Sequence, residues 1–205
     1  MHFDLDVYHQ RVGDLTAFIL AGGRSSRMGR DKAFVALIGR TLLERAMDLA
    51  GSITPNVCVV GPQKKFFAVG HTVEDVFPDC GPLGGIHAAL TNTETELNLV
   101  LAVDLPFVER DFLFYLISQA TQTGALVTVA QAGERLQPLC AVYRRGFVQA
   151  AEKALKKKKN KIDILFEQVE TRVIIGAEME RMGFSSTMFQ NLNTPEELQK
   201  AERSF

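Results

Sequence analysis

The stretch of the chain best suited to chemistry is a short glycine-rich segment, residues 20–32, with the sequence LAGGRSSRMGRDK. Three glycines and two serines follow an apolar run, and four cations are interleaved with them: Arg24, Arg27, Arg30 and Lys32. Glycine lets the backbone approach a ligand closely and point several N–H groups toward it, which suits phosphate oxygens. Because the cations would balance phosphate charge, the segment predicts a phosphate-binding loop in preference to an exposed polar turn.

This loop matches neither of two common nucleotide-binding motifs. Gly29 is followed by Arg30 and Asp31 where a Walker loop has Lys and then Ser or Thr, and the pattern Gly-x-Gly-x-x-Gly does not occur in the chain. The segment therefore indicates a third type of phosphate loop.

A second candidate for chemistry is Asp104, which follows the apolar run at residues 97–103. In an open α/β sheet, ligands bind outside the carboxyl ends of the strands, so an acid at this place would face the same crevice as the glycine-rich loop. Mg²⁺ prefers carboxylate and phosphate oxygens. The alternative is that Asp104 caps the next helix, but Leu105 and Pro106 delay that helix, which favours the functional interpretation.

The elements that must position these residues alternate between strands and helices. Strands are expected at residues 15–21, 56–61, 72–76, 97–103, 125–130, 138–143 and 171–175, and helices at 41–50, 83–90, 110–122, 146–159, 162–169 and 194–203. Strands that are apolar on both faces and alternate with helices indicate a mostly parallel sheet covered on both sides. We therefore predict an α/β fold: a single doubly wound, three-layer α/β/α domain, Rossmann-like, over residues 15–205, with residues 1–14 as an N-terminal extension.

Composition narrows the classes of function. The 205 residues carry 23 Lys and Arg against 24 Asp and Glu, a formal net charge of −1, which argues against a nucleic-acid-binding protein. No apolar run exceeds six residues, the length of residues 112–117, which is far below the about 20 that a membrane span needs. The charged start of the chain is unlike a secretory signal. A cytoplasmic protein is expected, with its three separated cysteines in or near the core.

The glycine-rich loop and four later motifs resemble one family. Residues 81–85 (GPLGG), 103–107 (VDLPF), 137–139 (QPL) and 191–197 (NLNTPEE) occur in that family's order, and the resemblance covers the chain from residue 15 to its end. The sequence is thus similar to the nucleotidyltransferases of the nucleotide-diphospho-sugar transferase superfamily, and in particular to the molybdenum cofactor guanylyltransferases. Glycine-rich loops alone are weak evidence, whereas five motifs in order are specific.

The resemblance implies an activity: transfer of GMP from GTP to the phosphate of molybdopterin or its molybdenum-bearing form, with release of pyrophosphate. It also implies GTP and molybdopterin as partners and Mg²⁺ as cofactor. Two alternatives stay open among enzymes, a cytidylyltransferase for molybdopterin and a nucleotidyltransferase for a sugar phosphate. A regulatory nucleotide-binding module is the alternative outside enzymes, but such a module would be expected to have lost Lys32 or Asp104.

The family also implies roles for individual residues. The implied catalytic residues are Arg24, Arg27, Lys32 and Asp104, with Asp104 as the magnesium ligand. The implied nucleotide-binding residues are Leu20, Ala21, Gly22, Gly23, Lys32, Asp75, Gly81, Pro82, Gly84 and Asp104. Asp79 competes with Asp75 for its role, since turn aspartates commonly cap their own backbone.

For the second substrate, the resemblance implies Lys159, Lys161, Asn191 and Asn193 as molybdopterin-binding residues. The family more often has arginines near the two lysine positions, and a lysine cannot form a bidentate fork with phosphate. The alternative for the lysines is a solvated helix end, and for the asparagines a polar helix entry. Transient contacts with proteins that supply the cofactor and with chaperones of the receiving apoenzymes are also expected.

Overall fold

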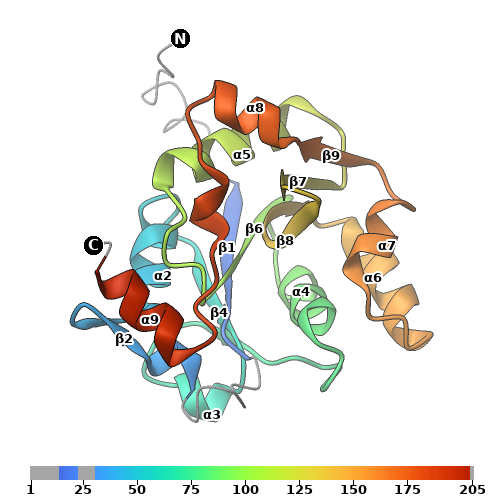
Figure 1. The fold of residues 1–205 in the computed structure, drawn as a ribbon. Helices are drawn as coiled ribbons and strands as arrows, with labels where there is room; N and C mark the ends of the chain where they lie inside the picture. The colour runs from blue at the N-terminus through green and yellow to red at the C-terminus, as the bar shows by residue number, and fades with distance from the viewer. Residues whose placement is uncertain (1–13, 23–30, 204–205) are drawn as a thin grey trace.

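The computed structural model describes residues 14–22 and 31–203, which form a seven-stranded sheet with helices on both faces (Figure 1). The order of the strands across the sheet is β5-β4-β1-β6-β8-β7-β9. Their bounds are β1 Leu15–Leu20, β4 Val57–Val60, β5 Thr72–Val73, β6 Leu97–Ala102, β7 Val127–Ala132, β8 Arg135–Arg144 and β9 Thr171–Ile174. Strand β8 is antiparallel to both of its neighbours, and the other adjacent pairs are parallel. The predicted mostly parallel α/β fold is confirmed.

The helices lie in two layers (Figure 1). One face of the sheet carries α2 Leu42–Gly51, α5 Arg110–Gln122, α8 Gly176–Arg181 and α9 Pro195–Glu202, and the other carries α4 Pro82–Thr91, α6 Phe147–Lys156 and α7 Ile162–Phe166. Shorter elements complete the chain: the 3-10 helices η1 Lys32–Phe34 and η2 Ser186–Phe189, the hairpin strands β2 Ala36–Leu37 and β3 Arg40–Thr41, and α3 Gln63–Phe66.

Strand β1 shows why these residues form a central strand. Alternate side chains of a strand point to opposite faces. Leu15, Ala17 and Ile19 belong to the buried cluster on the α2 and α5 side, and Phe18 belongs to a second buried cluster with Ala89 of α4. Because both faces are covered, the strand is apolar except at Thr16, whose hydroxyl accepts a hydrogen bond from the Thr95 hydroxyl at 2.9 Å.

Most of the expected elements occur, with two differences beside the site. The strand expected at residues 72–76 is limited to β5, because the Asp75 carboxylate accepts a hydrogen bond from the Phe77 N–H at 2.8 Å and turns the chain. The strand expected at 138–143 begins earlier, at Arg135, and pairs as a hairpin with β7.

The parallel strands bring their carboxyl ends to one edge of the sheet. Leu20, Val60, Val73 and Ala102 end β1, β4, β5 and β6, and the first residues of β8 join this edge because that strand runs in the opposite direction. The turns after these strands are therefore the parts of the chain that can build a site.

Two expectations concern the chain as a whole. Apart from Asp14, the predicted N-terminal extension lies outside the described residues. None of the helices in the described part of the chain is long and apolar enough to cross a membrane.

Candidate active site

Two adjoining cavities open at the carboxyl edge of the sheet. The first, here called the glycine-loop cavity, has a volume of about 730 Å³ and is lined by Leu20, Ala21, Gly22, Lys32, Val60, Gly61, Pro62, Glu74, Asp75, Pro78, Asp79, Gly81, Pro82, Gly85, Ala102, Val103, Asp104 and Leu139. The second, the C-terminal cavity, has a volume of about 1030 Å³ and lies between the start of β8, residues 186–193 and helix α9. Ala102, Asp104 and Leu139 line both, so the two cavities meet at Asp104.

Three of the predicted site residues come together at this junction. The Lys32 ammonium donates a hydrogen bond to Asp104 Oδ2 at 2.9 Å and another to Asn193 Oδ1. The Lys32 and Asp104 side chains are 22% and 17% exposed, so the pair is largely shielded from water. A cation, a carboxylate and an amide from three distant parts of the sequence thus share one position.

Asp104 is held there by its backbone. It follows β6 after one residue, Val103, whose N–H donates to Leu20 O at 3.2 Å and so joins the ends of β6 and β1. The Asp104 carbonyl accepts a hydrogen bond from the Leu192 N–H at 3.1 Å. The segment that carries Asn193 is therefore tied directly to the backbone of Asp104.

Lys32 is the first residue of η1, and the residue before it fixes this turn. The Asp31 carboxylate caps η1 by accepting from the Ala33 N–H at 3.1 Å, and it pairs with the Lys65 ammonium. That ammonium lies 4.6 Å from the centre of the Phe66 ring, a cation–π distance. These contacts hold the start of η1 against α3 while Lys32 extends into the site.

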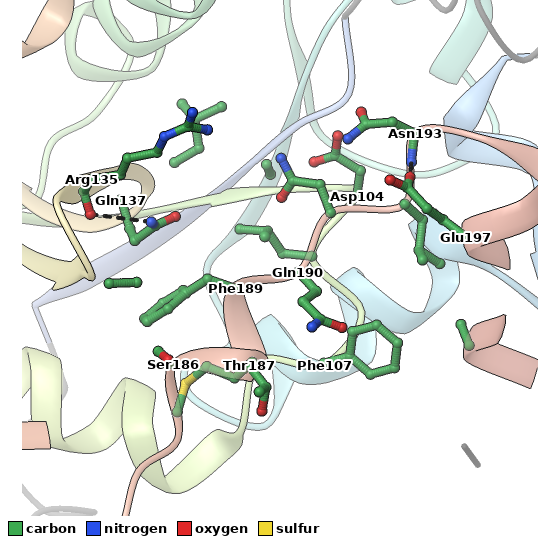
Figure 2. A pocket seen from close by; sticks show the side chains of 18 of the residues that line it. Asp104, Phe107, Arg135, Gln137, Ser186, Thr187, Phe189, Gln190, Asn193 and Glu197 are labelled. Carbon is green, nitrogen blue, oxygen red and sulfur yellow. Dashed lines mark hydrogen bonds between the residues drawn. The ribbon is translucent and has the colours of Figure 1, made fainter. Parts of the chain in front are cut away.

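Residues 191–193, which include Asn191 and Asn193, form one wall of the C-terminal cavity together with Phe189 of η2. Figure 2 shows Asp104, Asn193 and Glu197 gathered at one end of this cavity, with Arg135 and Gln137 of β8 across from them. Asn191 lines the cavity as well. One end of the cavity is therefore polar and next to Lys32, and a buried aromatic ring lies farther in.

Asp75 and its competitor Asp79 both line the glycine-loop cavity. Asp75 is the one that caps its own backbone, through the Phe77 N–H, whereas Asp79 adopts a left-handed conformation with φ of 64°. Burial raises the pKa of the Asp75 carboxyl, against the opposing effects of the Phe77 hydrogen bond and of nearby His87. Which of the two acids contacts a nucleotide stays a prediction.

The turn at residues 81–85 brings the start of α4 to the same cavity. Gly81 precedes the helix with φ of 67°, a conformation that favours glycine, and Gly81, Pro82 and Gly85 line the cavity. Gly84 is placed differently, because a Cβ on it would lie 2.5 Å from Asp75 Oδ2. The lack of a side chain at Gly84 allows Asp75 to pack against α4. A contact between Gly84 and a nucleotide stays a prediction.

Other predicted residues are not brought to the junction. Lys159 and Lys161 are exposed in the segment between α6 and α7, and neither is among the residues that line the two cavities. Gly23, Arg24 and Arg27 lie outside the described residues.

The structure adds residues to the candidate site that the sequence analysis did not single out. Gly61, Glu74 and Gly85 line the glycine-loop cavity, and Arg135 and Glu197 line the C-terminal cavity. Gly61 is the last residue of the strand expected at residues 56–61 and directly follows β4, so its place at a strand end was a usable signal. Arg135 had none, because the direction of β8 cannot be read from its apolar pattern.

The comparison with families of known proteins agrees with this geometry. Residues 17–171 match the model of the MobA-like NTP transferase domain. The chain therefore belongs to the MobA-like NTP transferase family. The match covers the glycine-rich loop, Asp75 and Asp104, and the resemblance expected from the sequence is confirmed.

Individual relatives match this chain over most of their length. A protein of Desulfosudis oleivorans named molybdenum cofactor guanylyltransferase is 32% identical over 191 residues, which cover 92% of this chain and 94% of that protein. A protein of Peptoclostridium acidaminophilum named probable molybdenum cofactor guanylyltransferase is 32% identical over 194 residues, 90% of this chain and 87% of that protein.

A solved structure has the same fold as this chain. Molybdopterin-guanine dinucleotide biosynthesis protein A from Archaeoglobus fulgidus superposes with a TM-score of 0.81 over 92% of this chain and 97% of that one, at 24% identity. The predicted Rossmann-like α/β/α architecture is thereby confirmed for this chain.

Proposed function

We propose that this protein transfers GMP from GTP to the terminal phosphate of molybdopterin, or of its molybdenum-bearing form, and releases pyrophosphate. The observation that carries the proposal is the Lys32–Asp104–Asn193 cluster at the junction of two cavities. A group transfer between two substrates needs two adjoining binding sites and charged groups where they meet. The relatives named molybdenum cofactor guanylyltransferase, which match over most of their length, support this choice of substrates.

GTP would occupy the glycine-loop cavity. Its phosphates would lie along the backbone of residues 20–22 and before the start of α4, since a helix N-terminus favours negative charge. Asp75 or Asp79 would face the nucleoside part. This arrangement would bring the α-phosphorus next to Lys32 and Asp104.

Molybdopterin would occupy the C-terminal cavity, with its phosphate toward the junction. Asn191 and Asn193 offer amide donors and acceptors that keep the same charge at any pH, and Phe189 offers an aromatic surface to the pterin. Lys159 and Lys161 do not line this cavity, so they would contact only a part of the substrate that extends beyond it. Contacts with cofactor-supplying proteins and apoenzyme chaperones also remain predictions.

In the proposed reaction, an oxygen of the molybdopterin phosphate attacks the α-phosphorus of GTP in line. The bond between the α-phosphorus and the bridging oxygen breaks, and pyrophosphate leaves with that electron pair. The attacking phosphate is already ionised at neutral pH, so no general base is required. Lys32, together with Arg24 and Arg27, would compensate the charge on the phosphates, and catalysis would rest on positioning and charge stabilisation.

A divalent cation fits the residues at the junction, and we propose Mg²⁺. One carboxylate and the oxygens of substrate phosphates are the usual ligands of Mg²⁺ in nucleotide sites, and Asp104 presents such a carboxylate to both cavities. When bound, the ion would neutralise phosphate charge. Lys32, which holds Asp104 Oδ2, would keep the carboxylate oriented.

The test is a reaction of the purified protein with molybdopterin, Mg²⁺ and each of GTP, CTP, UTP and ATP. Formation of a guanine dinucleotide and one pyrophosphate per turnover, with GTP preferred, is the expected result. Transfer from CTP would identify a cytidylyltransferase, and transfer to a sugar phosphate in place of molybdopterin would identify the other enzyme alternative. Binding of nucleotide with no transfer to any acceptor would favour the regulatory module and contradict the proposal.

A further inference from the structure

Helix α9 begins with a capping box that reaches beyond the helix. The Thr194 hydroxyl accepts a hydrogen bond from the Glu197 N–H at 3.2 Å, and Glu197 Oε2 accepts one from the Thr194 N–H at 3.0 Å. The same carboxylate oxygen also accepts a hydrogen bond from the Asn193 N–H at 2.6 Å. Figure 2 shows this last contact beside Asp104, at the polar end of the C-terminal cavity.

Helix α2 also begins with a capping box, and the comparison shows which contact is present only in that of α9. Helix α2 begins with Thr41, and Glu44 Oε2 accepts from the Thr41 N–H at 2.7 Å and the Thr41 hydroxyl at 2.8 Å. Both of these contacts are to the cap residue itself. In α9 the glutamate extends one residue farther, to the residue whose side chain holds Lys32.

The contacts form a continuous series from α9 to the junction. Glu197 holds the Asn193 backbone, Asn193 Oδ1 accepts from the Lys32 ammonium, and Lys32 donates to Asp104. The anchor itself is firm, because Ala201 of α9 is 3% exposed in the main buried cluster and Leu198 packs against that cluster. A carboxylate that accepts two backbone N–H groups forms charge-assisted hydrogen bonds, which are about twice as strong as neutral ones.

We propose that Glu197 is a positioning residue: through Asn193 it keeps the Lys32 ammonium at the junction of the two cavities. The functional part of this inference rests on the proposed GMP transfer. Glu197 touches no reacting atom in this scheme. It acts by fixing the backbone from which the Asn193 amide reaches Lys32, and the loss of its carboxylate would free that amide.

The direct test measures Lys32 in the protein without substrates. Trace acetylation with acetic anhydride, followed by peptide mass spectrometry, gives the reactivity of Lys32 relative to Lys156, a remote surface lysine paired with Glu152. Glu197→Ala should raise the relative reactivity of Lys32 several-fold, because its ammonium loses a fixed acceptor. Glu197→Gln keeps an oxygen acceptor and should restore reactivity close to that of the parent protein.

Glu44→Ala is the matched control, since it removes the corresponding carboxylate from the capping box of α2. Glu44→Ala should lower the melting temperature about as much as Glu197→Ala does, and it should leave the acetylation rate of Lys32 unchanged. Equal Lys32 reactivity in the folded Glu197→Ala variant and the parent would overturn the proposal. Should the alanine variant not fold, Glu197→Asp keeps the charge but shortens the reach, and the same comparison decides.

Kinetics then separate this inference from the proposed function. In GMP transfer, Glu197→Ala should lower kcat about tenfold or more, since a misplacement of about 1 Å can cost on the order of 10²-fold in rate. Glu44→Ala should keep the parent kcat. If Glu197→Ala changes Lys32 reactivity but the parent protein transfers no GMP, the positioning role is supported and the proposed function is contradicted. If the parent protein transfers GMP but Glu197→Ala leaves Lys32 reactivity unchanged, the function is supported and the positioning role is contradicted.

Discussion

The Lys32 ammonium lies 2.9 Å from Asp104 Oδ2, although 72 residues separate the two in the sequence. Lys32 ends the glycine-rich segment and begins η1, and Asp104 comes from the turn after β6, so the pair joins two connections at the same edge of the sheet. In the absence of substrates, each charge compensates the other. Phosphates and a divalent cation would offer each residue a partner of the opposite sign, so substrate binding need not leave either charge unpaired.

Lys32→Ala should lower the rate of GMP transfer by about 10²- to 10³-fold, the usual cost of removing one group that stabilises transition-state charge. Steady-state kinetics with saturating GTP and molybdopterin would measure it. Lys156→Ala, which removes an exposed cation from α6, is the matched control and should retain the parent rate. A near-normal rate from a folded Lys32→Ala protein would exclude the proposed role.

Asp104→Asn should remove the effect of Mg²⁺ on GTP binding, because an amide is a poor substitute for a carboxylate on a hard cation. The amide oxygen can still accept from Lys32, so the local structure should persist. The measurement is the increase in melting temperature caused by GTP, with and without Mg²⁺. Asp48→Asn, at an exposed pair with Arg40, is the control and should keep the Mg²⁺-dependent part of the shift. Retention of that part by Asp104→Asn would argue against a metal ligand at this position.

Local signals account for the parts of the fold that were predictable. The 110–122 helix was predicted with the bounds of α5. The helix expected at 194–203 begins one residue later, at Pro195, where the Thr194 side chain caps α9, an interaction decided within one turn of chain. Apolar runs also located β1, β4 and β6. The two-residue strands of the β2–β3 hairpin are too short to show any period, and they were missed.

The features that could not be predicted from the sequence depend on contacts between distant segments. Asn193 meets Lys32 across 161 residues, which no spacing could indicate, and only the family motifs suggested that both belong to one site. The antiparallel direction of β8 depends on its pairing with β6 and β7, so the place of Arg135 in the C-terminal cavity was hidden. Lys159 and Lys161 were chosen by position in a motif, without knowledge of where α6 ends.

Gly84→Ala should destabilise the protein by about 1–3 kcal/mol, the usual range for an overpacked site. The added Cβ would lie 2.5 Å from Asp75 Oδ2 and 2.9 Å from the Phe77 carbonyl oxygen, and the latter belongs to the backbone and cannot rotate away. GTP affinity should fall with it, because Asp75 lines the glycine-loop cavity. Denaturant unfolding and GTP titration would measure the two effects.

Gly51→Ala supplies the comparison for that variant. Gly51 also lies in a helix, α2, but nothing is found within 4 Å of the position of its missing Cβ. An alanine there should be neutral or stabilise by about 0.4–1 kcal/mol, since it restricts the unfolded chain. If both variants were equally stable, close packing between Gly84 and Asp75 would not be important for the fold.

Asp75→Asn should stabilise the protein at neutral pH, and the gain should disappear in acid. Burial raises the pKa of Asp75 above its ordinary value of 3.8, so the folded protein holds this proton to a higher pH than the unfolded chain does. Ionisation of Asp75 therefore opposes folding: the cost is absent below pH 3.8, develops as the pH rises through the raised pKa, and is complete above it. Asparagine avoids that cost and can still accept from the Phe77 N–H.

The measurement for Asp75→Asn is the denaturant midpoint of the variant and the parent protein from neutral pH down to about pH 4, near the ordinary pKa of a carboxyl. The difference in midpoint should be positive at neutral pH and shrink steadily toward zero as the pH falls. A difference that is independent of pH would mean that burial does not shift this group. A loss of stability at neutral pH would mean that the carboxylate has a stabilising partner whose contribution exceeds the cost of its burial. Because Asp75 also lines the glycine-loop cavity, the same variant should bind GTP less tightly, which would make Asp75 a residue that trades stability for function.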